Sequence, residues 1–152
     1  MCVSVLVLFT LHFVLHFGLS YGSGAPDFLT LGLLIAAREL TLSRAAGLGL
    51  VVGLLEDAMS LLAFGANSIA MTLIATGGSV TRDLFVGDSR LFFPAYIFAG
   101  KWTRDLIHWL AMGPEVRHPF IEQAVVEGSL GALYVAGIAI VFSTVRGSWS
   151  ER

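Results

Sequence analysis

The fold of this chain is decided by the stretch RAAGLGLVVGLLEDAMSLLAF, residues 44–64. The stretch is 21 residues long, and as one α-helix it would extend about 30 Å, which is enough to cross a bilayer. Two adjacent carboxylates, Glu56 and Asp57, interrupt its apolar sequence. Each charge near the centre of a membrane helix costs about 2.5 kcal/mol or more. We therefore expect both carboxylates to face protein or water rather than lipid.

The composition of the whole chain predicts a single-domain integral membrane protein. Of the 152 residues, 56% are hydrophobic and 13% are charged, and the mean hydropathy is +0.82. A soluble domain normally carries about twice that share of charged residues. The formal net charge is −2. The sequence has no stripe of basic residues that could contact phosphates, so nucleic-acid binding is not expected. The predicted fold class is an all-α integral membrane protein, a compact bundle with short loops.

Apolar runs separated by turn residues divide residues 1–152 into six predicted transmembrane helices, all within one domain. The six ranges are 3–19, 27–40, 44–64, 67–85, 91–112 and 121–145. The second range is short, because only about 11 apolar residues precede Arg38, a length closer to a partial crossing or a re-entrant helix. It crosses fully only if Arg38 and Glu39 extend their charged ends to the interface.

The placement of arginine favours six spans with both termini in the cytoplasm. On that topology only Arg117 lies outside, which satisfies the rule that basic residues stay on the cytoplasmic side. The arginines at the inner side are Arg38, Arg44, Arg82, Arg90, Arg146 and Arg152. A five-span alternative would move the N-terminus outside, and the absence of charged side chains from residues 1–26 would permit it.

The intramembrane charges are predicted to share one depth. Counting about 1.5 Å per residue from the cytoplasmic end of each span places them in a single polar layer. The predicted layer consists of Glu56, Asp57, Lys101, Arg104, Asp105, His108 and Glu127. Spacings of three and four put the four members from the fifth span on one helical face. The simplest arrangement pairs that face with Glu56 or Asp57 and with Glu127.

Such a layer has three readings. Charges that match in depth and sign most often form structural ion pairs, which fix the register of helices and relieve each other's desolvation. The alternatives are a polar cavity that binds a partner and a pathway for protons or ions. The layer by itself does not choose among the three.

A stripe of small residues continues into the acidic pair. Gly49, Gly53 and Asp57 follow one another at steps of four, so they lie on one helical face. A small-x-x-x-small pattern lets a second helix approach closely. Asp57 is therefore expected at a contact between helices, whereas Glu56 lies about 100° around the helix.

Catalytic and metal-binding patterns are not evident in the sequence. His12 and His16 have the i, i+4 spacing of metal ligands, but no third ligand is evident, and a polar contact between helices is the alternative. No Ser-His-Asp or Cys-His arrangement and no phosphate-cradling glycine loop occurs at a meaningful spacing. We expect no catalytic residues, no metal and no cofactor.

Residues 25–85 contain a short span led by Pro26, a glycine-rich span with Gly53-x-x-x-Asp57, and the following element Gly65-Ala-Asn67. This pattern resembles the rod shape-determining protein MreD family. It implies a non-enzymatic scaffold subunit of the cell-elongation complex in the bacterial inner membrane, supporting peptidoglycan synthesis. The implied direct partner is MreC, with MreB, RodA and a class B penicillin-binding protein in the same assembly.

Two other functions remain open. The substrate-binding subunits of energy-coupling-factor transporters are also small six-helix proteins, and MreD is distantly similar to them. Their coupling surface uses an Ala-x-x-x-Ala element in the first span, and residues 3–19 contain no alanine. A proton-coupled transporter that uses the polar layer is the third possibility.

Overall fold

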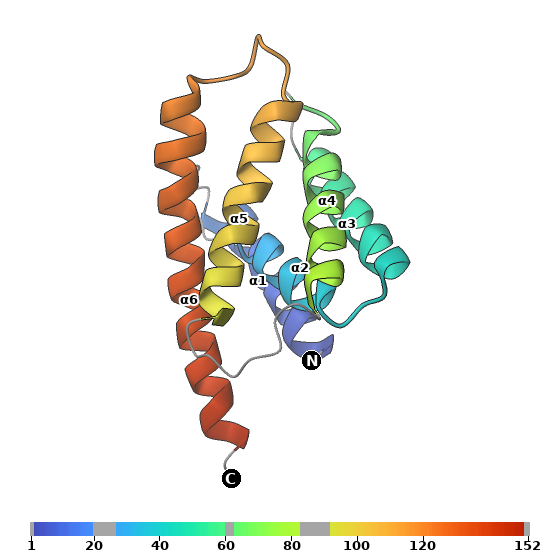
Figure 1. Ribbon diagram of the computed structural model, residues 1–152, viewed down its shortest axis with the longest axis vertical. Coiled ribbons are helices and arrows are strands. Elements are labelled where there is room, and N and C mark those ends of the chain that lie inside the picture. The colour runs from blue at the N-terminus through green and yellow to red at the C-terminus, as the bar shows by residue number, and fades with distance from the viewer. Residues whose placement is uncertain (1, 20–26, 60–62, 83–91, 151–152) are drawn as a thin grey trace.

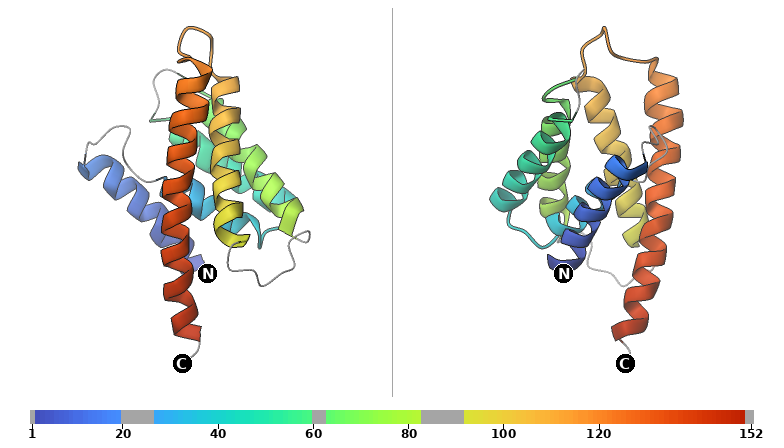
Figure 2. Two further views of the ribbon diagram at one scale, coloured as in Figure 1. Left: turned by 60° about the vertical axis from the view of Figure 1, so that its left-hand side comes forward. Right: turned by 180° about the vertical axis from the view of Figure 1, so that it is seen from behind.

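The described part of the chain is all-helical, as the composition predicted. The computed structural model describes residues 2–19, 27–59, 63–82 and 92–150. Within these ranges the elements in chain order are α1 (Cys2–Leu19), α2 (Phe28–Ala37), α3 (Leu42–Asp57), α4 (Ala66–Thr81), α5 (Phe92–Ala111), the π-helix η2 (Ile121–Glu127) and α6 (Gly128–Ser150). α6 runs beside α5 on one side of the molecule, and α3 and α4 lie on the other side (Figure 1; Figure 2).

The short helix α2 lies at the centre of the bundle. It contacts α1, α3, α4, α5 and α6, and eight of its ten residues are buried. A helix that is apolar on every side is stable only when other elements surround it. Its ten residues extend about 15 Å, half of a bilayer core. The second predicted span is therefore an internal helix that cannot cross a membrane unaided.

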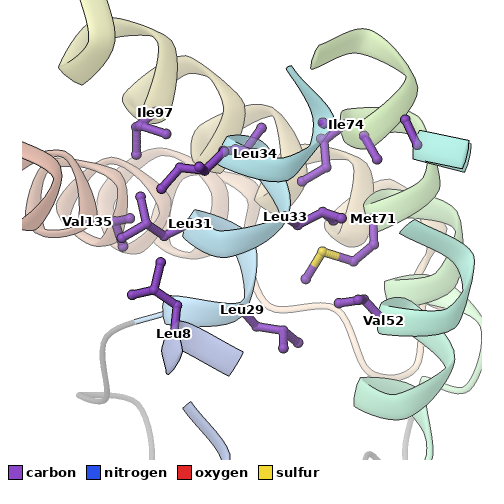
Figure 3. Packing of buried hydrophobic residues seen from close by; sticks show 14 of the residues in the cluster. Leu8, Leu29, Leu31, Leu33, Leu34, Val52, Met71, Ile74, Ile97 and Val135 are labelled. Atoms are coloured by element: carbon purple, nitrogen blue, oxygen red, sulfur yellow. The ribbon is translucent and has the colours of Figure 1, made fainter. Parts of the chain in front are cut away.

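The hydrophobic core is built around α2. Leu29, Leu31, Leu33 and Leu34 are almost wholly buried, and side chains from the five other α-helices pack on them (Figure 3). The labelled partners are Leu8 from α1, Val52 from α3, Met71 and Ile74 from α4, Ile97 from α5 and Val135 from α6. All six α-helices thus share one core.

The prediction of a continuous helix to Phe64 is wrong. α3 ends at Asp57, and the amide of Met59 bonds to the Glu56 carbonyl in a turn. Residues 63–65 are not helical. The helix ends early because the Asp57 side chain bonds to the first amides of α4, so the chain reverses there. Glu56 and Asp57 consequently lie at the end of a helix rather than inside one.

The glycine stripe of α3 lies against α4. A Cβ added at Gly49 would lie 2.6 Å from the Met71 carbonyl oxygen and 2.9 Å from the Ala75 Cβ. A Cβ added at Gly53 would overlap the Ser68 Cα and lie 2.7 Å from the Asn67 carbonyl oxygen. These neighbours are mostly backbone, which cannot move aside without shifting α4.

Only one described segment has by itself the length and composition of a membrane span. That segment is Ile121–Val141, and one-third of its most apolar window is buried. α5 is long enough, with 20 residues, but it carries Lys101, Arg104 and Asp105. Val5–Val14 and Phe28–Ala37 are apolar but shorter. The structure therefore establishes a helical bundle, whereas the number of membrane crossings stays a prediction.

We predict that Gly53→Ala destabilises the protein by about 1–3 kcal/mol, because its methyl group overpacks the contact with the α4 backbone. The matched control is Gly47→Ala in the same helix, where an added Cβ meets no atom within 4 Å. This control should be neutral or stabilising by up to about 1 kcal/mol, since alanine favours helix over glycine. Thermal unfolding in detergent, followed by circular dichroism, measures both. Equal midpoints for the two variants would contradict the contact.

Candidate functional site

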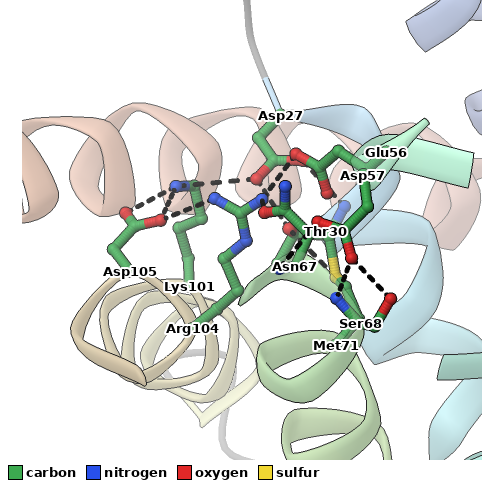
Figure 4. Close-up of polar contacts among 10 residues, drawn as sticks. All are labelled: Asp27, Thr30, Glu56, Asp57, Asn67, Ser68, Met71, Lys101, Arg104 and Asp105. Atoms are coloured by element: carbon green, nitrogen blue, oxygen red, sulfur yellow. Dashed lines mark hydrogen bonds and ion pairs between the residues drawn. The ribbon is translucent and has the colours of Figure 1, made fainter. Parts of the chain in front are cut away.

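A cluster of polar side chains lies where α2 begins, α3 ends, α4 begins and the middle of α5 passes (Figure 4). Its members are Asp27, Thr30, Glu56, Asp57, Asn67, Ser68, Met71, Lys101, Arg104 and Asp105. We call this set the polar cluster. It holds five of the seven residues of the predicted layer and brings them into contact inside the bundle.

Asp57 caps α4 from a neighbouring helix. Its side chain is fully buried and accepts bonds from the backbone amides of Asn67, at 3.0 Å, and Ser68, at 2.9 Å, and from the Ser68 hydroxyl, at 2.5 Å. The N-cap residue itself is Gly65, which has no side chain to offer and adopts φ +95°. Glycine suits this left-handed backbone. A carboxylate at a helix N-terminus is favoured both by the free amides and by the helix dipole.

Arg104 joins α5 to α3 and α4. Its Nη2 donates to Glu56 Oε1 at 2.5 Å and to Asn67 Oδ1 at 2.7 Å. Its Nη1 donates to Asp105 Oδ1 at 3.1 Å. Of the two carboxylates in α3, the arginine therefore pairs with Glu56, while Asp57 is occupied by α4.

Lys101 joins α5 to the central helix. Its Nζ lies 2.6 Å and 2.5 Å from the two carboxylate oxygens of Asp105, and 3.5 Å from Asp27 Oδ2. Asp27 in turn caps α2, because its carboxylate accepts from the Thr30 amide at 2.8 Å and from the Thr30 hydroxyl at 2.6 Å. Both cations of the cluster are thus held by carboxylates, which offsets the cost of removing them from water.

Beside the polar cluster lies a cavity of about 670 Å³ between α5 and the start of α6. Lys101, Arg104 and Asp105 form one wall, together with His108, and Glu127 lies on the other. The expected pairing of Glu127 with the cations of α5 is not formed, because no ion pair among the described residues includes it. Lys101 already forms ion pairs with Asp105 and Asp27. The Glu127 side chain remains exposed.

The remaining predicted site residues have different outcomes. Pro26 lies outside the described residues. His12 is buried against the edge of Phe13, with ring centroids 5.7 Å apart, and the side chain of His16 is outside the described part. Among the described residues, no three histidine, cysteine, aspartate or glutamate side chains are grouped as metal ligands.

Five members of the cluster were missed from the sequence: Asp27, Thr30, Asn67, Ser68 and Met71. Asp27 is an N-cap placed three residues before Thr30, at the start of an apolar run, and this local pattern was a usable signal. Asn67 and Ser68 belong to the cluster only because α4 begins next to Asp57 and Arg104. Arg104 and Asn67 are 37 residues apart in the chain, and no local spacing relates them.

Comparisons of the chain with protein-family models, with curated proteins and with solved structures found no match. The case for a function therefore rests on the geometry of the polar cluster and the cavity, together with the resemblance in the sequence. Within the cluster, Asp57, Lys101 and Arg104 each contact residues of a neighbouring helix or its cap.

We predict that Asp57→Ala destabilises the protein more than Glu56→Ala does. The alanine at 57 leaves two backbone amides and a hydroxyl without their acceptor, at about 1–3 kcal/mol for each group that stays buried and unpaired. The alanine at 56 removes one carboxylate from Arg104, which keeps Asp105 and Asn67. Unfolding midpoints in detergent and the yield of assembled complex measure the difference. Equal and negligible effects would defeat this assignment.

Proposed function

We propose that this protein is a non-enzymatic scaffold of the bacterial inner membrane that binds an MreC-like membrane protein within the cell-elongation complex. MreB, RodA and a class B penicillin-binding protein are the further members of that assembly, which supports peptidoglycan synthesis. The observation that carries the proposal is the polar cluster, whose cations and capping carboxylates all hold one helix to another. Such a cluster maintains a shape, which is what a scaffold offers to its partners.

The distribution of polar and apolar side chains supports a location in the membrane. Charged groups are buried, including Asp57, Lys101 and Arg104, whereas large apolar side chains are exposed on η2 and on every α-helix except α2. Examples are Leu6, Val7 and Val14 on α1, Val51 and Leu55 on α3, Ile69, Leu73 and Val80 on α4, and Leu130, Leu133 and Val141 on α6. A soluble monomer rarely exposes so much apolar surface. Helices shorter than the bilayer core are accommodated by local thinning of the membrane.

The arrangement of the chain ends supports the proposed topology. The start of α1 and the end of α6 lie toward the same end of the molecule (Figure 1). An even number of crossings and a cytoplasmic position of both termini agree with this arrangement. Arg117, at the opposite end, has a structural task there, since it donates to the carbonyls of Leu110 and Met112 at the end of α5. In the proposed topology, these bonds give Arg117, the one arginine outside, a local structural role.

Three of the residues that carry the family resemblance, all within the described part of the chain, build one structural unit. Gly53 lets α4 approach, Asp57 caps α4, and Gly65 provides the left-handed turn before it. Each residue serves the pairing of α3 with α4, and none of the three faces the cavity. This supports a role for the pattern in shaping a helix pair rather than in catalysis.

The alternative is a small-molecule-binding membrane subunit similar to the substrate-binding components of energy-coupling-factor transporters. The cavity of about 670 Å³ favours it, because it is large enough for a small ligand. The absence of alanine from residues 3–19 counts against coupling to a transporter.

We predict that the full-length tagged chain, purified in mild detergent, retains an MreC-like partner and no vitamin. Mass spectrometry of the eluate identifies both kinds of ligand. Gly47→Ala is the matched control and should retain the partner, because its added methyl group meets no atom within 4 Å. A tightly bound vitamin without a protein partner would replace the scaffold with the alternative.

We also predict that the chain stays in the membrane pellet after extraction with alkaline carbonate. Its exposed apolar helices contact lipid in the proposed arrangement, so removing peripheral electrostatic contacts should not release it. Immunoblotting of pellet and supernatant gives the result, with a peripheral membrane protein as control. Recovery of the protein in the supernatant would contradict the proposed location in the membrane.

A further inference from the structure

The cavity beside the polar cluster is not used by the scaffold role. It lies between α5 and the junction of η2 with α6, where Lys101 and Asp105 line it from α5. The contacts of Arg104 with Glu56 and Asn67 lie on its inner side, whereas the ion pair of Lys101 with Asp27 lies on its wall. A ligand in the cavity can therefore leave the contacts of Arg104 with Glu56 and Asn67 in place.

The polar end of the cavity has more negative than positive charge. Asp27, Asp105 and Glu127 lie on its walls, against the two cations Lys101 and Arg104. Both cations are already engaged by carboxylates, and one of those carboxylates, Glu56, lies behind the wall. Glu127 takes part in no ion pair among the described residues, and Glu56 Oε2 is buried without a hydrogen-bond donor from them. Three carboxylates against two cations leave one net negative charge on the lining, which favours a cationic ligand over an anionic one.

The other end of the cavity is apolar. Leu130, Tyr134 and Val135 of α6 form its wall there. A ligand that fills the whole space therefore needs a cationic group at one end and an apolar body at the other. An inorganic cation fits less well, because the described residues contain no group of three metal-ligating side chains.

The wall formed by η2 and α6 has an unusual backbone and open space. η2 is a π-helix of seven residues, and π-helical turns are rare and occur frequently at functional sites. It places Gln123 and Glu127 on the cavity. Two glycines follow: a Cβ added at Gly128 would lie 3.7 Å from the Asp105 Cβ, and one at Gly131 would lie 4.0 Å from Lys101 Nζ. An added methyl group would make ordinary van der Waals contact with α5 at both positions, so the two glycines lie on the wall of the cavity.

We propose that this cavity binds the primary ammonium group of an amphiphile. The ammonium contacts the carboxylates of Glu127 and Asp105, and the apolar part lies against Leu130 and Val135. An ethanolamine lipid headgroup and a soluble alkylamine both present this chemistry. The lipid source rests on the membrane location proposed above, whereas binding of an alkylamine does not.

The test uses the full-length protein in nanodiscs of phosphatidylcholine with a small amount of acyl-labelled phosphatidylethanolamine, and separately in detergent with octylamine. We expect preferential binding of phosphatidylethanolamine over labelled phosphatidylcholine, and displacement of the labelled lipid by octylamine. Glu127→Gln should weaken both by about tenfold, the loss of one charge-assisted contact. The Glu127 side chain is exposed, so this variant should keep its helical content and unfolding midpoint.

A pair of leucine substitutions in α6 provides the matched control. Gly131→Leu fills the cavity and should abolish binding, whereas Gly137→Leu, where an added Cβ meets no atom within 4 Å, should leave binding unchanged. If Gly131→Leu does not fold, Glu127→Gln still decides the question. Equal binding of the two lipids, or wild-type affinity in Glu127→Gln, overturns the proposal for the lipid.

The remaining outcomes separate this site from the scaffold role. Binding of octylamine without any preference for phosphatidylethanolamine assigns the site to a soluble amine. No binding in either arm, with the MreC-like partner still retained, overturns the cavity proposal and leaves the scaffold standing. A third outcome is that the wild type binds no amine and that Glu127→Gln loses the MreC-like partner. This result would assign the cavity to a basic side chain of the partner, and it would overturn the amine proposal.

Discussion

The bond between the Asp57 carboxylate and the first amides of α4 is the interaction on which the rest of the structure depends. It joins the end of α3, at Asp57, to the first turn of α4, which begins at Ala66. Because Gly49 and Gly53 continue the same face, the two helices then lie in backbone contact along their length. The same arrangement places Glu56 and Asn67 side by side. Their side-chain oxygens both accept hydrogen bonds from Arg104.

Arg104 and Lys101 extend that arrangement to α5 and α2. Four helices meet at one group of ion pairs and caps, while the exposed faces of α3 and α4 remain apolar. A buried ion pair contributes little net stability, but removing one partner is costly, so such a cluster specifies one arrangement more than it stabilises it. Lys101 and Arg104 form ion pairs toward α2 and α3. On the side of these two residues that faces η2 and α6, a cavity remains. The cavity therefore adjoins the polar cluster.

The spacing of residues along the sequence and the predicted depth of the charges gave correct predictions where the property depends on a single helix. The steps of four from Gly49 to Asp57 define a face whatever the neighbour is, and that face lies against α4. Counting along spans brought Lys101, Arg104 and Glu56 to one level, and they meet in the structure. The same counting failed at Phe64, because it assumed a continuous helix. It failed at Glu127 because equal depth does not bring two helical faces together.

The sequence alone determined that the described chain is helical, that one face of residues 44–57 is lined by glycine, and that its charges gather within the bundle. Only the tertiary structure decided which carboxylate pairs with which cation. Glu56 and Asp57 are chemically alike and adjacent, so their different roles depend on where α4 begins and where α5 passes. Those positions result from packing around the buried helix α2, and a contact between segments 37 or more residues apart leaves no local trace in the sequence.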